Sequence, residues 1–145
     1  MNNKKRVAVL GGGSFGTALC NLIAEKGHDA ILWLRNSDRA DEINKQHKNS
    51  YYLADFVLHE NVKATTHLDN AIKHAEVIFV AVPSSSCRVV CEQIKPLIND
   101  QVIIVSTTKG IEHQRFMLMS QVISEILPAN PLGVLSGPNL AKEIM

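Results

Sequence analysis

Three consecutive glycines follow a short apolar run near the start of the chain, in the stretch "RVAVLGGGSFGTALC" at residues 6–20. Gly11, Gly13 and Gly16 have the spacing G-x-G-x-x-G and stand between a predicted strand and a helical pattern. In such a turn the first glycine permits the tight bend, the second lets a pyrophosphate approach the backbone, and the third lets helix and strand pack closely. The stretch therefore predicts a dinucleotide-binding turn, and the alternative is a turn that needs glycine for packing alone.

The helix predicted after the glycines begins without any charged side chain. Free backbone N–H groups near Ser14 and Phe15, together with the positive end of the helix dipole, would bind the anionic pyrophosphate. A charged side chain is not needed for such a site, which explains its absence here.

Short apolar runs alternate with helical patterns along the chain. The predicted strands are residues 6–10, 30–34, 62–65, 77–82, 102–106 and 133–136, and the predicted helices lie near 15–23, 37–49, 84–97 and 116–127. Several of the strands are apolar throughout, which is typical of parallel strands covered by helices on both faces. The predicted fold class is α/β, a doubly wound and mainly parallel sheet, over residues 1–145 as one domain. Residues 48–60, with Tyr51, Tyr52 and Phe56, are predicted to form a packed loop.

Composition disfavours several classes of partner. The 15 Lys and Arg residues almost balance the 14 Asp and Glu residues, so the net charge of +1 gives no reason to expect nucleic acid or an acidic membrane surface. No apolar segment approaches the length of a membrane span or a signal peptide. Three cysteines without an export signal indicate reduced thiols and a cytoplasmic protein. Cys87 and Cys91 share the apolar stripe of one helix and predict core packing, so we expect no metal site.

The end of the second predicted strand bears on the choice of dinucleotide. NAD-binding proteins often place an acidic residue there to bond the ribose hydroxyls, whereas an arginine accommodates the 2′-phosphate of NADP. Here the strand ends in Arg35, and Asp38 lies three residues later in the first turn predicted for the next helix. NADP is therefore favoured over NAD, and the alternative is that Arg35 is a solvated surface cation.

Five motifs along the chain resemble the NAD(P)-dependent glycerol-3-phosphate dehydrogenases of bacterial type. They are "VLGGGSFGTAL", "LWLR", "VAVPSSS", "STTKGIE" and "LSGPNLAKEI", in that order, and they cover nearly all 145 residues. The resemblance implies a Rossmann-type sheet, and a helical C-terminal domain that this chain lacks.

The resemblance also implies roles for individual residues. Cofactor binding is expected of the glycine turn with Ser14 and Phe15, of Arg35 at the adenosine end, of Lys109 and of Ala141. Substrate binding is expected of Lys109, Gly137 and Asn139, although the bacterial enzymes often carry Ser or Thr in place of Asn139.

The implied reaction interconverts sn-glycerol 3-phosphate and dihydroxyacetone phosphate by hydride transfer, which supplies glycerol 3-phosphate for phospholipid synthesis. In the family, the general-acid lysine follows the "GPNLAKE" segment in a second domain, beyond Met145. We therefore expect no catalytic residue within this chain, little or no turnover by the chain alone, and a native enzyme of roughly twice this length. A homodimer of that native-length enzyme is a further expectation.

Two other functions stay open from the sequence. One is a different dehydrogenase, of hydroxyacid or ketopantoate type, built on the same cofactor domain. The other is a module that binds NAD(P)H and signals to a partner without chemistry.

Overall fold

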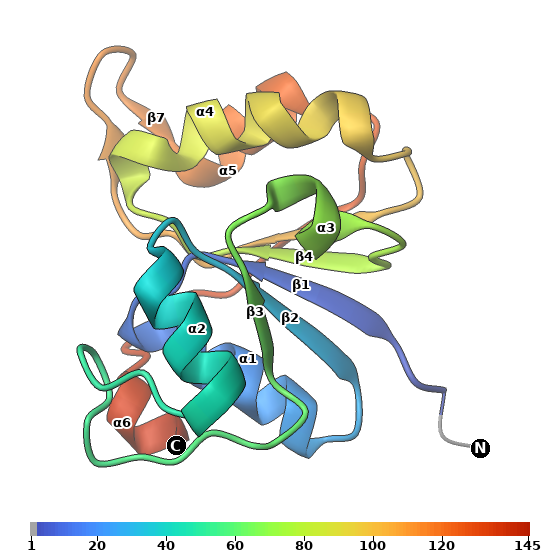
Figure 1. The fold of residues 1–145 in the computed structure, drawn as a ribbon. Coiled ribbons are helices and arrows are strands. Elements are labelled where there is room, and N and C mark those ends of the chain that lie inside the picture. Colours follow the sequence, from blue (N-terminus) through green and yellow to red (C-terminus); the bar gives the residue numbers. More distant parts are fainter. Residues whose placement is uncertain (1–2) are drawn as a thin grey trace.

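Six parallel strands form the central sheet of the computed structural model, which describes residues 3–145 (Figure 1). The strand order is β3-β2-β1-β4-β5-β8. The strands are β1 (Arg6–Leu10), β2 (Asp29–Trp33), β3 (Lys63–Thr65), β4 (Val77–Val80), β5 (Ile103–Ser106) and β8 (Leu132–Val134). This is the order of a doubly wound sheet, so the predicted fold class is confirmed.

Helices cover both faces of the sheet (Figure 1). One face carries α3 (Leu68–Ile72), α4 (Ser84–Ile94) and α5 (Met119–Ile126), and the other carries α1 (Ser14–Glu25), α2 (Ser37–Gln46) and α6 (Ala141–Ile144). A short 3-10 helix, η1 (Lys95–Leu97), extends α4, and β6 (Ile111–Glu112) pairs with β7 (Met117–Leu118) in a separate antiparallel hairpin.

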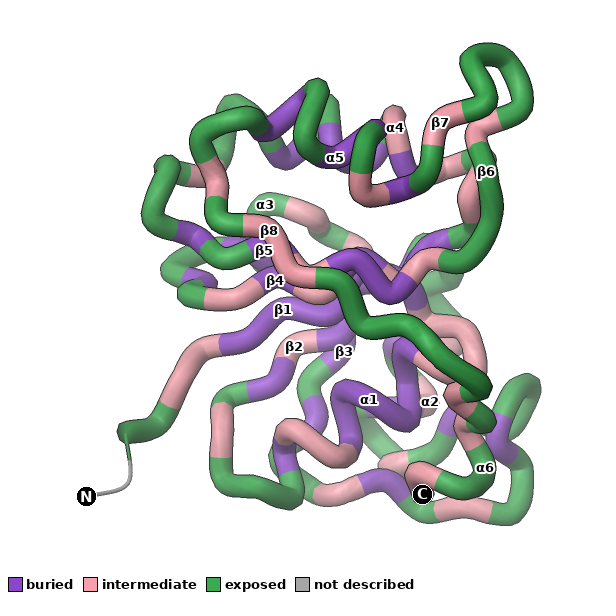
Figure 2. The backbone as a smooth tube through the Cα atoms, turned by 180° about the vertical axis from the view of Figure 1, so that it is seen from behind, coloured by how far each residue is buried: buried purple, intermediate pink, exposed green. Residues whose placement is uncertain are grey.

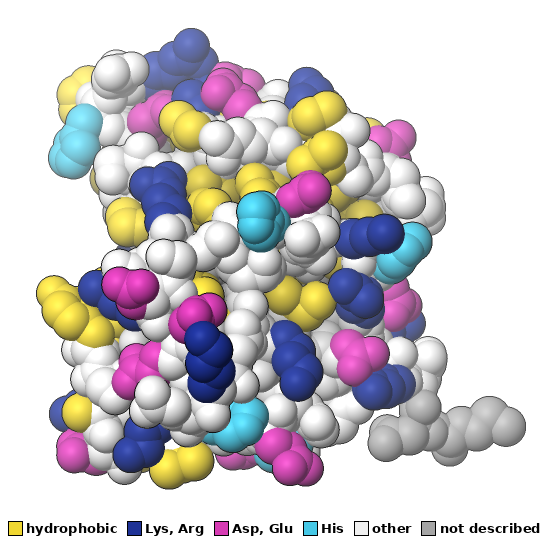
Figure 3. All heavy atoms as spheres, viewed as in Figure 1, with side chains coloured by type: hydrophobic (Ala, Val, Ile, Leu, Met, Phe, Trp, Pro, Cys, Tyr) yellow, Lys and Arg dark blue, Asp and Glu magenta, His cyan; other side chains and the backbone are white. Residues whose placement is uncertain are grey.

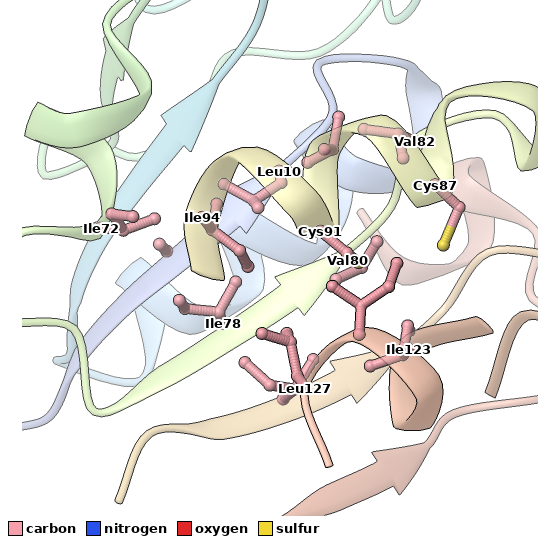
Figure 4. Close-up of a cluster of buried hydrophobic side chains, with 14 of the residues drawn as sticks. Leu10, Ile72, Ile78, Val80, Val82, Cys87, Cys91, Ile94, Ile123 and Leu127 are labelled. Atoms are coloured by element: carbon pink, nitrogen blue, oxygen red, sulfur yellow. The ribbon is translucent and has the colours of Figure 1, made fainter. Parts of the chain in front are cut away.

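Each face of the sheet buries its own hydrophobic core. Ala8 and Leu10 of β1 point into the core shared with α4 and α5, whereas Val9 between them points into the core shared with α1 and α2. Figure 4 shows the first core, where Ile78 and Val80 of β4 meet the apolar stripes of both helices. Because both faces are buried, the strands are apolar throughout instead of alternating.

Each predicted strand is present, with ends that shift by one or two residues, but the region after β5 differs from the prediction. Phe116 does not belong to the apolar stripe of a helix: it lies in the β6–β7 hairpin with a φ of 54° and is 83% exposed. The helix begins only at Met119, because residues 111–118 form the hairpin first. α3 was not predicted, since its five residues are too few for a clear helical period.

The loop at residues 48–60 packs against the domain, as expected, but not through its aromatic residues. Leu53 and Leu58 are buried, while Tyr51 is 73% exposed and Phe56 is only half-buried. The tyrosines instead contact an arginine on α2, as described below.

Positive and negative side chains are mixed on the face shown in Figure 3, in keeping with the net charge of +1. Residues 135–138, in the connection between β8 and α6, are exposed on the surface (Figure 2). Across residues 3–145, none of the helices has the length and apolar character that crossing a membrane requires.

Candidate functional site

A cleft of about 560 Å³ lies beyond the carboxyl ends of β1 and β4. β1 pairs with β2 on one side and with β4 on the other. The chain therefore runs outward from β1 to β2 and β3, and then crosses back to β4 on the other side of β1. Ligands of doubly wound folds bind at this switch point, and the volume is in the range of small-molecule sites. The lining includes the whole glycine turn, residues 11–16, together with residues from the loops after β2, β4 and β5.

The glycine turn is held close to the neighbouring strands. The Gly11 N–H donates to the Trp33 carbonyl over 2.9 Å, and Gly11 has a φ of 123°. A Cβ on Gly11 would overlap the Ala81 carbonyl, and a Cβ on Gly16 would overlap the Gly11 carbonyl oxygen. Both glycines are therefore required by close backbone approach, as the motif predicts.

Gly13 differs from the other two glycines because a Cβ there would have no heavy atom within 4 Å. Gly13 is the N-cap of α1, has no side chain to satisfy the first N–H groups, and leads into a first turn without acidic residues. Gly13, Ser14 and Phe15 all line the cleft, and the first N–H groups of a helix have no partner within the helix. This arrangement can bind a phosphate group through the backbone.

At the other end of the cleft, the loop after β5 is fixed to the end of β4. The Thr107 hydroxyl donates to the Val80 carbonyl over 2.8 Å, and the Thr108 hydroxyl donates to the Val82 carbonyl over the same distance. These bonds hold the segment that carries Lys109 against the cleft, which Asn139 also lines. Lys109 and Asn139 thus add an ammonium group and an amide group to the lining of the same cleft.

The end of β2 places two arginines at the cleft. The Arg35 guanidinium lies 5.9 Å from the centre of the Trp33 ring, and Arg39 follows in the first turn of α2. Asn36 caps α2, its side chain accepting from the Arg39 N–H over 2.9 Å. With Lys109, the lining of the cleft in the described chain contains three cations and no carboxylate. This charge balance suits an anionic ligand.

A long-range contact supports the glycine turn from the loop after α2. The buried Asn49 side chain donates to the Gly12 carbonyl over 3.1 Å and to the Thr17 hydroxyl over 2.9 Å. Further along the loop, the His59 N–H donates to the Asn21 side chain over 2.7 Å. The loop is thus tied to both halves of α1.

The structure brings most of the sequence-predicted site residues together. The cleft is lined by Gly11, Gly13, Ser14, Phe15, Gly16, Arg35, Lys109 and Asn139. Gly137 and Ala141 are outside the lining: Gly137 is exposed with a φ of 128°, and Ala141 begins α6. The predicted roles of all these residues stay predictions.

Several lining residues were missed by sequence reasoning, among them Asn36, Arg39, Tyr52, Thr107 and Thr108. The two threonines follow a strand on the ligand-binding edge, a signal that could have identified them. Arg39 and Tyr52 meet only through folding of the loop after α2, so no local pattern indicates them.

Cys87 and Cys91 are buried in the core between α4 and the sheet, as predicted (Figure 4). Ser84 to Ser86 form the first turn of α4 after the N-cap Pro83, and Ser86 lines the cleft.

The strand order, the glycine turn at the switch point and the cationic cleft together define a dinucleotide-binding domain of the Rossmann type. Residues 6–145 match the profile of one family, described as NAD-dependent glycerol-3-phosphate dehydrogenase N-terminus, and the chain belongs to that family.

Similar proteins agree with this assignment. An NAD(P)+ glycerol-3-phosphate dehydrogenase from Acinetobacter baumannii is 53% identical over 140 residues, which are 97% of this chain and 39% of that protein. A relative of the same name from Teredinibacter turnerae is 47% identical over 145 residues, 100% of this chain and 43% of that protein. The crystal structure of glycerol-3-phosphate dehydrogenase from Coxiella burnetii aligns with a TM-score of 0.90 at 35% identity, over 97% of this chain and 43% of that chain. The chain thus spans well under half the length of these relatives.

Proposed function

We propose that residues 1–145 form the N-terminal dinucleotide-binding domain of an NAD(P)-dependent glycerol-3-phosphate dehydrogenase. The reaction is the interconversion of sn-glycerol 3-phosphate and dihydroxyacetone phosphate by hydride transfer. The observation that carries the proposal is the cleft itself, where the glycine turn, Arg35, Lys109 and Asn139 line one continuous space. Membership of the family and the 53% identical relative support the choice of substrate.

The residues of the glycine turn fit the dinucleotide. The space around Gly13 is open to 4 Å, and the first N–H groups of α1 have no capping side chain. In the proposal, these N–H groups, at Ser14 and Phe15, bind the pyrophosphate, and Ala141 lies against the cofactor. When bound, the nicotinamide supplies or accepts the hydride.

Arg35 holds the adenosine end of the cofactor in this proposal. The proposed cofactor is NAD or NADP, and NADP is favoured because Arg35 follows β2 at the position where an acidic residue would bond the ribose of NAD.

Lys109, Gly137 and Asn139 bind the substrate in this proposal. Lys109 neutralises negative charge on the phosphate or on the reacting oxygen, and the Asn139 amide donates a hydrogen bond to the substrate. We assign the proton transfer to none of residues 3–145. The 145-residue chain is therefore expected to bind cofactor with little or no turnover.

A chimera tests the proposed function. Residues 1–145 replace the matching segment of the Acinetobacter baumannii relative, and NADPH oxidation with dihydroxyacetone phosphate is followed at 340 nm. The proposal expects turnover by the chimera and its loss in a Lys109→Met chimera. A chimera that folds and binds NADPH but reduces only other carbonyl substrates, such as ketopantoate, would identify a different dehydrogenase.

A cytoplasmic location, a homodimer and the absence of nucleic acid among the partners belong to the same proposal. The three free, buried cysteines suit a reducing compartment. The nearly balanced charge offers no electrostatic attraction to nucleic acid.

A further inference from the structure

The guanidinium of Arg39 is held over the cleft by two tyrosine rings. It lies 4.1 Å from the centre of the Tyr51 ring and 5.0 Å from the centre of the Tyr52 ring. The rings themselves meet edge to face, with centres 4.8 Å apart at an angle of 80°. Stacking on aromatic faces fixes an arginine while leaving its N–H groups free to donate.

Arg39 and Arg35 carry charge that no neighbouring carboxylate neutralises. The ion pairs found within residues 3–145 involve Arg88 and Arg115 among the arginines, and neither Arg35 nor Arg39. Asp38 lies between them in sequence but is exposed and does not line the cleft. Two unneutralised guanidiniums therefore line the same end of the cleft.

The position of this end identifies the ligand group. This end of the cleft follows β2, where dinucleotide-binding sheets hold the adenosine ribose. The first turn of α2, a ten-residue helix, adds the positive end of its helix dipole there. A 2′-phosphate is the part of NADP(H) that NAD(H) lacks, and planar guanidinium groups suit phosphate oxygens.

We infer that Arg39, held by the rings of Tyr51 and Tyr52, forms with Arg35 a two-cation site for the 2′-phosphate of NADP(H). Arg39 is thus a specificity-determining residue, and Tyr51 is a positioning residue that does not itself line the cleft. This inference rests on the proposed cofactor-binding function and names the group that the adenosine end selects.

Fluorescence titration tests the inference on the 145-residue chain. Trp33 is the single tryptophan of the chain and lines the cleft, so energy transfer to NADPH or NADH reports binding directly. Adenosine 2′,5′-bisphosphate and 5′-AMP are titrated as competitors, because they differ only in the 2′-phosphate.

For Arg39→Gln we expect the affinities for NADPH and for adenosine 2′,5′-bisphosphate to fall about tenfold, the usual effect of one lost charge-assisted hydrogen bond. The affinities for NADH and AMP should stay within about twofold, since neither has a group for Arg39 to bind. Tyr51→Leu should lower the NADPH to NADH affinity ratio, and Tyr51→Phe should restore it because the aromatic face is kept. Lys45→Gln, at the other end of α2 and paired with Asp41, is the control that removes the same charge.

Several results would overturn the inference. An equal loss of NADPH and NADH affinity in Arg39→Gln would mean that Arg39 stacks on the adenine instead. Unchanged affinities for both dinucleotides in Arg39→Gln would remove Arg39 from the site. An unchanged NADPH to NADH ratio in Tyr51→Leu would mean that the tyrosines do not position Arg39. Failure of the unmodified, folded chain to bind either dinucleotide would overturn the proposed function as well, and so differs from failure of the inference alone.

Discussion

The side-chain amide of Asn49 lies 3.1 Å from the carbonyl oxygen of Gly12, although the two residues are 37 positions apart in the sequence. The same amide reaches the Thr17 hydroxyl in the first turns of α1. The loop after α2 therefore fixes the conformation of the glycine turn, and a buried amide on that loop contributes to the shape of the cleft.

Replacement of Asn49 by alanine should affect both stability and binding. The change leaves the Gly12 carbonyl without this donor, which costs about 1–3 kcal/mol of unfolding free energy for a buried group. NADPH affinity should fall as well, because the turn loses its support. Urea denaturation and fluorescence titration measure the two effects.

Asn44→Ala is the matched control for Asn49→Ala. Asn44 makes two hydrogen bonds with the backbone of Ala64, over 2.8 and 2.9 Å, and does not line the cleft. The Asn44→Ala variant should have a lower unfolding free energy but an unchanged NADPH affinity. Equal losses of affinity in the two variants would show that Asn49 acts only through global stability.

Gly13 and Gly16 should respond differently to alanine. In Gly16→Ala the new methyl group overlaps the Gly11 carbonyl oxygen, so we expect a loss of about 2–3 kcal/mol in unfolding free energy. In Gly13→Ala the methyl group meets no protein atom, so stability should stay within about 0.5 kcal/mol.

The methyl group of the Gly13→Ala variant would nevertheless project where the pyrophosphate approaches the backbone. The NADPH affinity of this variant should therefore fall at least about tenfold. Thermal unfolding and titration of the two variants separate these effects. Full NADPH affinity in Gly13→Ala would place the phosphate elsewhere.

The ion pairs of Arg88 predict a pH dependence of stability. Its guanidinium donates to Glu112 over 2.5 and 3.0 Å and to Glu125 over 2.8 Å, bracing the β6–β7 hairpin against α4 and α5. These hydrogen bonds hold the pKa of each carboxyl below its ordinary value. A carboxyl whose pKa is lower in the folded state adds to the unfolding free energy in full at pH values above its pKa in the unfolded chain, about 4.3. This contribution is lost as the pH falls through the pKa of the folded state.

The unfolding free energy should therefore fall more steeply below about pH 4.3 in the unmodified chain than in Arg88→Met. Urea midpoints at a series of pH values between neutral and strongly acidic provide the measurement. Lys45→Met, which breaks an exposed pair with Asp41, should leave the profile unchanged. Parallel profiles for Arg88→Met and the unmodified chain would contradict the prediction.

The three cysteines should be unreactive in the folded chain. Cys20, Cys87 and Cys91 are fully buried, and burial raises the pKa of the Cys20 thiol to about 12. Because the thiolate is the reacting form, a disulfide reagent at pH 8 should modify the thiols only as fast as the chain opens. The rate of modification is measured without denaturant and again in urea. Modification that is as fast without denaturant as in urea would contradict the prediction and show that this core is open.

Local sequence patterns predicted the sheet because each strand between two helical layers must be apolar on both faces. Val9 and Leu10 point into different cores, and both positions are hydrophobic in consequence. The glycine turn was equally predictable, since backbone approach at Gly11 and Gly16 admits no side chain.

Contacts between distant segments were not predictable from local patterns. The apolar residues at 116–119 have helical spacing, yet the β6–β7 hairpin is braced by Arg88 of α4 and takes Phe116 out of the helix. Arg39 meets Tyr51 only because the loop after α2 folds back along the cleft. Such contacts depend on the tertiary fold, which a single sequence window does not contain.

Amide chemical shifts during a titration with NADPH test the central claim most directly, since a chain of 145 residues suits such spectra. We predict that the largest shifts fall on the amides of residues 11–16, Arg35 and residues 107–109, which line the cleft. Shifts confined to another surface of the chain, or no saturable shifts in a folded chain, would contradict the account.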